Sequence, residues 1–202
     1  MITKLDRYQW SYEDWRPLLQ ALKRPNTYRY ALLAPEPKYK TLHQRKGRSF
    51  ETPFGWLHLS KVPREGHVDL TKGSIRVGPL VLYVNMRTGR IQQQANRQWV
   101  RGKLKLARAA SRPYWKGSYR RSVKEYLAFL NALAWDVQRC VDSGVFIQGP
   151  TVSAFNSELR RIAIRTLTSV YAIPYGQAKQ LVEKYLHKVV FNRHKHNTHK
   201  SG

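Results

Sequence analysis

The strongest periodic pattern in the chain runs from Ser118 to Asp142, which read SYRRSVKEYLAFLNALAWDVQRCVD. Its apolar residues recur at intervals of three and four between Val123 and Val141, which places them on one face of a helix. Gly144 follows at the position of a helix stop. The stretch therefore predicts a long amphipathic helix, whose apolar face must be buried against other elements.

The segments on both sides of this helix also have a helical pattern. A helix is expected over residues 98–110 and ends at 112–113, because a residue before proline disfavours helical geometry. A third helix over 149–170 is apolar almost all round, so we expect it at the centre of a bundle. A last amphipathic segment follows a turn at 173–176. Residues 97–191 are thus predicted to form three or four helices.

The N-terminal part has the pattern of strands instead. After one short helix over residues 11–24, apolar and aromatic residues predict strands at 28–34, 54–59, 67–70 and 75–86. The last of these is expected to bend at Gly78-Pro79 and to enter a hairpin whose returning strand is short. The fold class we predict is α+β, with a mainly antiparallel N-terminal sheet behind one leading helix, followed by a C-terminal bundle of three or four helices.

Three regions follow from this pattern. Residues 1–96 form a small α+β sheet region with an exposed basic loop at 35–53. Residues 97–191 are expected to form a basic helical region, and 192–202 are expected to form a flexible basic tail that contains histidines. A single core shared by the first two regions is the alternative to separate cores.

Charge is distributed unevenly along the chain. Residues 70–124 contain fourteen Lys and Arg but no Asp or Glu, and ten of these cations fall within 97–124. The whole chain has 37 basic and 12 acidic residues, a formal net charge of +25 at pH 7. Such an excess repels itself unless anions are near, so a polyanion is the expected partner. Trp and Tyr residues lie among the cations and can stack on bases, which favours nucleic acid.

The densest part of this region is the segment from Arg112 to Arg121, which joins two helices. Its four cations can neutralise phosphates and its three rings can stack on unpaired bases, although the rings could instead fill the core. The hairpin tip from Arg87 to Arg90 could clamp a backbone or be a solvated turn. The predicted nucleic-acid-binding residues are Arg45, Lys46, Arg48, Arg87, Arg90, Arg97, Arg101, Lys105, Arg108, Arg112, Tyr114, Trp115, Lys116, Tyr119, Arg120, Arg121 and Lys124.

The leading hypothesis is a non-enzymatic protein that binds RNA or single-stranded DNA. One alternative is a metal-independent ribonuclease or RNA-processing factor, for which His58 and His67 are weak candidates as proton-transfer groups. Another is a structural component of a nucleoprotein particle. A third is a duplex DNA regulator with a helix-turn-helix at 160–190, although two antiparallel helices explain that segment better. Its second helix, expected at 177–190, would read DNA through Gln177, Lys179, Gln180 and Lys184.

No motif in the sequence calls for a metal or a cofactor. The twelve acids are scattered, and the tail histidines His194, His196 and His199, with His187 upstream, favour adventitious metal binding over a functional site. The single cysteine, Cys140, is assigned to packing, and the lack of a second one fits a reducing intracellular compartment such as the cytoplasm. No apolar run approaches the length that spans a bilayer, so no membrane partner is expected.

Overall fold

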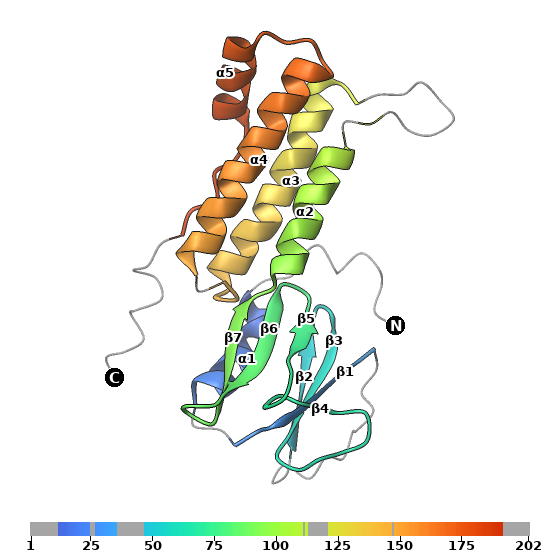
Figure 1. The fold of residues 1–202 in the computed structure, drawn as a ribbon, viewed down its shortest axis with the longest axis vertical. Helices are drawn as coiled ribbons and strands as arrows, with labels where there is room; N and C mark the ends of the chain where they lie inside the picture. The colour runs from blue at the N-terminus through green and yellow to red at the C-terminus, as the bar shows by residue number, and fades with distance from the viewer. Residues whose placement is uncertain are drawn as a thin grey trace. The chain divides into compact units, whose positions relative to one another are not determined.

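The structure, a computed structural model, describes residues 12–24, 27–35, 47–110, 112, 121–146 and 148–191 (Figure 1). Antiparallel sheets follow one helix in the N-terminal half, and helices make up the C-terminal half, so the predicted α+β class is confirmed. The described residues fall into two compact units. The sheet unit contains the residues up to Asn96 together with 142–146, and the helical unit contains 97–141 and 148–191.

The sheet unit has two antiparallel sheets. The first has the strand order β2-β3-β1-β4 and is made of β1 (Tyr30–Ala34), β2 (Gly47–Thr52), β3 (Gly55–Ser60) and β4 (Val68–Asp69). The second has the order β5-β6-β7 and is made of β5 (Ile75–Val77), β6 (Leu80–Asn85) and β7 (Arg90–Ala95). The leading helix α1 (Tyr12–Lys23) buries Trp15, whose ring centroid lies 6.0 Å from that of Phe54. This contact ties the helix to the turn between β2 and β3.

The prediction of an exposed loop over residues 35–53 is wrong for its last part, because Gly47–Thr52 is the strand β2. Phe50 and Thr52 are buried on one face of the strand, Glu51 is exposed on the other face, and Arg48, at the start of the strand on the face of Phe50, is exposed. The strand is at the edge of its sheet, where exposed charge is common and discourages pairing with another chain. Residues 36–46 of the predicted loop lie outside the described residues.

The expected bent strand over residues 75–86 is instead a hairpin of β5 and β6, in which Val77 pairs with Leu80. Gly78 has a φ of 53°, and a Cβ there would lie 2.5 Å from the Phe54 ring, so only glycine fits this turn. The predicted hairpin after this strand is confirmed, since Asn85 pairs with Arg90 across the turn between β6 and β7. The returning strand is six residues long and not short.

The helical unit contains α2 (Arg97–Ala109), α3 (Val123–Asp142), α4 (Gly149–Ser169) and α5 (Tyr175–Tyr185). The first three lie side by side, with α2 and α4 running in one direction and α3 in the other (Figure 1). Each turns an apolar stripe inward, as the sequence pattern predicts, and Tyr126, Leu130, Phe155 and Leu159 are among the fully buried side chains. The predicted helical bundle is therefore present.

The start of α3 is later than the pattern suggested. Ser122 precedes the helix, and its hydroxyl oxygen accepts the backbone N–H of Glu125 at 3.2 Å. In return, the Glu125 carboxylate accepts the backbone N–H of Ser122 at 2.7 Å. This reciprocal capping box satisfies two N–H groups that the first helical turn would leave unpaired, and it defines Val123 as the first helical residue. Residues 118–120 lie outside the described residues.

Two expectations for the C-terminal helices are wrong. The helix α4 is not apolar all round, because Arg160, Arg161 and Arg165 are exposed on its outer side. The helix α5 ends at Tyr185, so the second helix expected at 177–190 is too long. The chain continues in an extended conformation held by side-chain amides of α3 and α4, which bond to its backbone at Tyr185, His187, Val189 and Val190.

Candidate nucleic-acid interface

Carboxylates of the helical unit form ion pairs with cations of the same unit. Asp136 of α3 pairs with Lys103 of α2 and with Arg139 one turn along α3. Glu183 of α5 pairs with Arg160 of α4. These acids therefore hold helices together and do not balance the other cations of the unit.

Glu158 of α4 has two cationic partners from different helices. Its carboxylate accepts hydrogen bonds from Arg161 at 2.8 and 2.9 Å and from Arg108 of α2 at 2.5 Å. These partners, Arg161 above all, lower the pKa of Glu158 to about 2. The residue is thus ionised throughout the physiological range, and its charge is already neutralised by protein groups.

The exposed side of α2 carries a row of cations. Arg97, Arg101, Lys105 and Arg108 are all exposed and follow one another at intervals of four, four and three residues, which places them on one helix face. The buried face of the same helix consists of Val100, Leu104 and Ala107. None of these four side chains belongs to the core, so packing does not explain why they are there. Their charges face the solvent and are available to a ligand.

The hydrogen bond between Arg108 and Glu158 brings α4 alongside this row. Arg161 and Arg165 are exposed and lie three and seven residues after Glu158, so they share its side of α4. We call the combined surface the α2–α4 basic face; it consists of Arg97, Arg101, Lys105, Arg108, Arg161 and Arg165. Among the described residues of this face, Glu158 is the acid that lies between the cations.

The other predicted residues of the helical unit have different surroundings. Lys124 and Arg112 are exposed. Arg121 is partly buried: its guanidinium donates to the carbonyl of Ala110 at 3.0 Å and lies 5.0 Å from the centre of the Phe129 ring. It therefore connects the end of α2 to the start of α3. The predicted contacts Tyr114, Trp115, Lys116, Tyr119 and Arg120 lie outside the described residues.

The predicted contacts of the sheet unit are on its surface where the structure describes them. Arg48 is exposed on β2, with its guanidinium 5.0 Å from the centre of the Phe50 ring. Arg87 and Arg90 are exposed at the turn between β6 and β7. Arg45 and Lys46 lie outside the described residues.

The two histidines considered for catalysis have structural surroundings. His58 is fully buried in β3, with its Nδ1 atom 2.6 Å from the Ser49 hydroxyl oxygen. His67 is half-buried, with Nδ1 3.2 Å from the carbonyl oxygen of Glu65, and burial lowers its pKa. A general base must reach the hydroxyl whose proton it removes, so the burial of His58 favours a core role.

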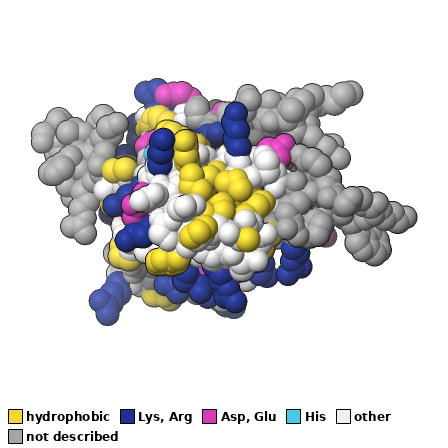
Figure 2. Space-filling model, turned by 90° about the horizontal axis from the view of Figure 1, so that it is seen from above, with side chains coloured by type: hydrophobic (Ala, Val, Ile, Leu, Met, Phe, Trp, Pro, Cys, Tyr) yellow, Lys and Arg dark blue, Asp and Glu magenta, His cyan; other side chains and the backbone are white. Residues whose placement is uncertain are grey.

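The end of the helical unit where α4 joins α5 has a different character. Seen from that end, hydrophobic side chains gather on the surface, with Lys and Arg side chains around them (Figure 2). Ala172, Pro174 and Tyr175 of this turn are exposed, and Tyr175 retains 66% of its accessible surface. The four residues expected to read a DNA groove, Gln177, Lys179, Gln180 and Lys184, are exposed on α5. The apolar turn before them lacks the cations that phosphate contacts require.

The described part of the chain shows neither a cluster of metal ligands nor an exposed thiol. No three His, Cys, Asp or Glu side chains there lie close enough together to hold a metal ion. His194, His196 and His199 are outside this part. Cys140 is buried, and its burial raises the pKa of the thiol well above the usual value, so its assignment to packing is confirmed. None of the described helices has the length and apolar character needed to cross a bilayer.

Two features of the surface were missed by sequence reasoning. Arg161 and Arg165 were overlooked because α4 was taken for a core helix, although their spacing to Glu158 is a recognisable signal. Trp135 was assigned no role, yet it retains 48% of its accessible surface and stacks on His187, with ring centroids 4.0 Å apart and an interplanar angle of 7°. No pattern in the sequence indicates this stack, because His187 belongs to the extended segment after α5.

Comparison of the chain with known protein families, with curated proteins and with solved structures finds no match.

Proposed function

We propose that the chain is a non-enzymatic nucleic-acid-binding protein that holds RNA or single-stranded DNA against the α2–α4 basic face. The observation that carries the proposal is the row formed by Arg97, Arg101 and Lys105, whose side chains are exposed on one side of α2. Residues 97–191 contain seventeen Lys and Arg against five Asp and Glu, and three of those acids are engaged in ion pairs. A bound polyphosphate would supply the missing negative charge.

The arrangement suits a phosphate backbone better than an isolated anion. Successive cations of the row are about one helical turn apart, and a turn rises about 5.4 Å. A row of this kind can follow several phosphates of one strand, each neutralised by a separate side chain. Phosphate contacts of this type carry no sequence information, so we expect affinity without strong sequence preference.

Exposed rings support the preference for single strands. Trp135 presents an indole in the same helical unit, and its stack on His187 holds the ring in place. Unpaired bases stack on such rings, whereas the bases of a duplex are already stacked on one another.

The proposal is tested by measuring binding of fluorescently labelled single-stranded RNA, single-stranded DNA and duplex DNA of equal length. If roughly 6 to 10 phosphates are contacted, affinity should fall by about 10³ to 10⁵ between 50 and 200 mM salt. The same RNA incubated with the protein in EDTA should remain intact. Absence of binding at low salt, or an affinity that does not respond to salt, would overturn the proposal, and cleaved RNA would replace it with the ribonuclease hypothesis.

A further inference from the structure

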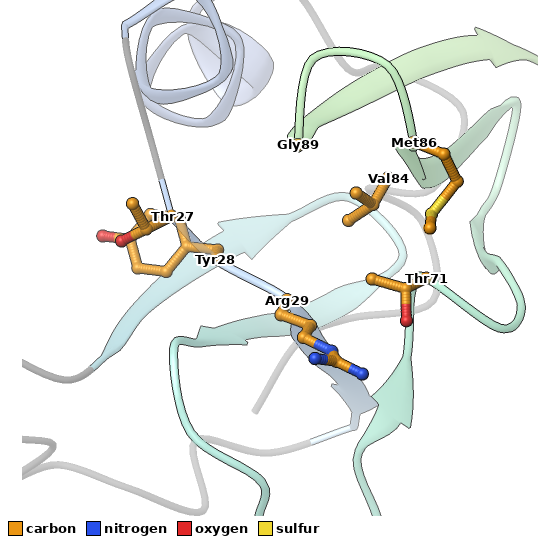
Figure 3. Close-up of a pocket in the computed structure, with 7 residues that line it drawn as sticks. All are labelled: Thr27, Tyr28, Arg29, Thr71, Val84, Met86 and Gly89. Atoms are coloured by element: carbon orange, nitrogen blue, oxygen red, sulfur yellow. The ribbon is translucent and has the colours of Figure 1, made fainter.

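The sheet unit contains a small pocket of about 240 Å³ beside the hairpin of β6 and β7 (Figure 3). It is smaller than the roughly 300 to 1,000 Å³ of pockets that hold drug-sized ligands. We propose that this pocket takes one unpaired nucleobase of a nucleic-acid strand, an inference that rests on the proposed function. The lining residues are Thr27, Tyr28, Arg29, Thr71, Val84, Met86 and Gly89.

The walls of the pocket suit a flat ring. Tyr28 lies on one side and Val84 and Met86 on the other, with Arg29 between them (Figure 3). Met86 retains 74% of its accessible surface, although large apolar side chains are usually buried. A base inserted between Tyr28 and Met86 would contact an aromatic ring and a polarisable thioether, both of which stack on π systems. The insertion would also remove the exposed methionine from water.

The guanidinium of Arg29 is fixed by hydrogen bonds and can donate to the edge of such a base. Its Nε and Nη2 atoms donate to the two carboxylate oxygens of Asp69, at 3.1 and 2.8 Å. Thr71 holds the same carboxylate through its hydroxyl at 2.6 Å and its backbone N–H at 3.0 Å. A guanidinium has five N–H donors, so it can keep this pairing and still donate to a base carbonyl or ring nitrogen.

The charge of the surroundings identifies the ligand as part of a polynucleotide. Arg87 follows Met86 in the chain and Arg90 follows Gly89, and both arginines are exposed on the hairpin. They can neutralise the phosphates on either side of an inserted base. Arg29 and Asp69 neutralise each other within the wall, so the pocket itself favours a neutral ring. A neutral, flat acceptor flanked by negative charge describes a nucleobase within a strand.

The test compares a single-stranded uridine oligonucleotide with an abasic oligonucleotide that has the same number of phosphates. The variants are Met86→Ala and Tyr28→Leu, and the control is Val62→Ala, which shortens an exposed apolar side chain of the same unit outside the pocket. We expect each pocket variant to bind the uridine strand about tenfold more weakly and the abasic strand as wild type does, because stacking is lost and phosphate contacts are kept. The control should bind both strands as wild type does.

Unchanged affinity of both pocket variants for the uridine strand would overturn the pocket proposal, as would equal losses on the two strands. Met86 lies on an exposed turn, so its replacement leaves the fold intact and keeps the test decisive. If the wild-type protein binds neither strand at low salt, the proposed function itself fails. The two failures are therefore distinguished by the wild-type measurement alone.

Discussion

Arg108 of α2 donates a hydrogen bond of 2.5 Å to Glu158 of α4. The same carboxylate also accepts two hydrogen bonds from Arg161, so one acid binds two cations of the α2–α4 basic face. The hydrogen bond between Arg108 and Glu158 joins two residues that are 50 positions apart in the sequence, and it links two helices that run in the same direction. It also reduces the positive charge offered to a ligand, which makes Glu158 a sensitive place to test the interface.

Replacement of Glu158 by glutamine should strengthen nucleic-acid binding while it weakens the fold. The substitution removes one negative charge from the face and frees Arg108 and Arg161 to contact phosphate. We expect the affinity for a single-stranded oligonucleotide to rise by about three- to tenfold, with a steeper dependence on salt. The melting temperature should fall, because an ionic link between α2 and α4 is lost. Binding titrations and thermal melts measure both effects.

The matched control is Glu183→Gln, which removes one charge and one ion pair from the pair of α4 and α5. Glu183 pairs with Arg160, which is not part of the α2–α4 basic face, so its effect on affinity should be smaller. An affinity that decreases in Glu158→Gln, or that rises equally in both variants, would contradict this placement of the interface.

The same carboxylate predicts a pH dependence of stability. The pKa of Glu158 is about 2 in the folded protein, against an ordinary value of 4.5. Between these values the unfolded chain binds more protons than the folded one, so stability rises with pH there. The contribution of the residue should be complete above about pH 4.5 and lost as pH falls toward 2. Urea unfolding of wild type and Glu158→Gln should therefore differ at neutral pH and converge in acid; a difference that stays constant with pH would disprove the linkage.

Removal of two cations from α2 should weaken binding to every nucleic acid. In the double variant Arg101→Ala with Lys105→Ala, two exposed charges of the row are lost and no core contact changes. We expect the affinity at about 0.1 M salt to fall by about 10- to 100-fold and the salt slope to decrease by about 2. Titrations over a range of salt concentrations measure both quantities.

A second pair of substitutions on α5, Lys179→Ala with Lys184→Ala, removes the same charge from exposed positions outside the face. It should have a smaller effect, and the effect should be the same for single strands and duplexes. A selective loss of duplex binding in the α5 variant would favour the groove-reading alternative instead.

The order and type of the helices could be predicted because each buries an apolar stripe with a period that local sequence reveals. The strand β2 could not be predicted from the sequence, because Arg48 and the basic residues before it are typical of a loop. The buried side chains of this strand are Phe50 and Thr52. Charge near a strand says nothing about the strand itself when the charged side chains point into solvent.

The basic face was predictable only on the side of α2. Its row of cations has a helical spacing, whereas the contribution of α4 depends on a pairing between Arg108 and Glu158 that no local pattern indicates. The end of α5 was missed for a similar reason. The extended segment after Tyr185 is held by amide side chains such as Gln138 and Asn156, which belong to distant helices. Contacts between elements decide such features, and a single sequence does not record them.

Lys103, which belongs to the stretch of residues 70–124 without Asp or Glu, should contribute to the stability of the fold and not to nucleic-acid binding. Lys103 pairs with Asp136, and only 12% and 13% of their side-chain surfaces remain accessible. Lys103→Met leaves the poorly solvated Asp136 carboxylate with Arg139 as its remaining ion-pair partner, so the free energy of unfolding should fall by about 2 kcal/mol, as urea denaturation would show. Adding Asp136→Leu removes this partly compensated charge and should restore part of the loss, because Lys103 and Asp136 are then replaced by apolar groups, although the partly exposed Arg139 loses its ion pair. The affinity of the folded single variant for RNA should stay within about twofold of wild type, since Lys103 is not an exposed phosphate contact. A large loss of affinity with unchanged stability would reverse this assignment and extend the interface to the side of α2 that faces α3.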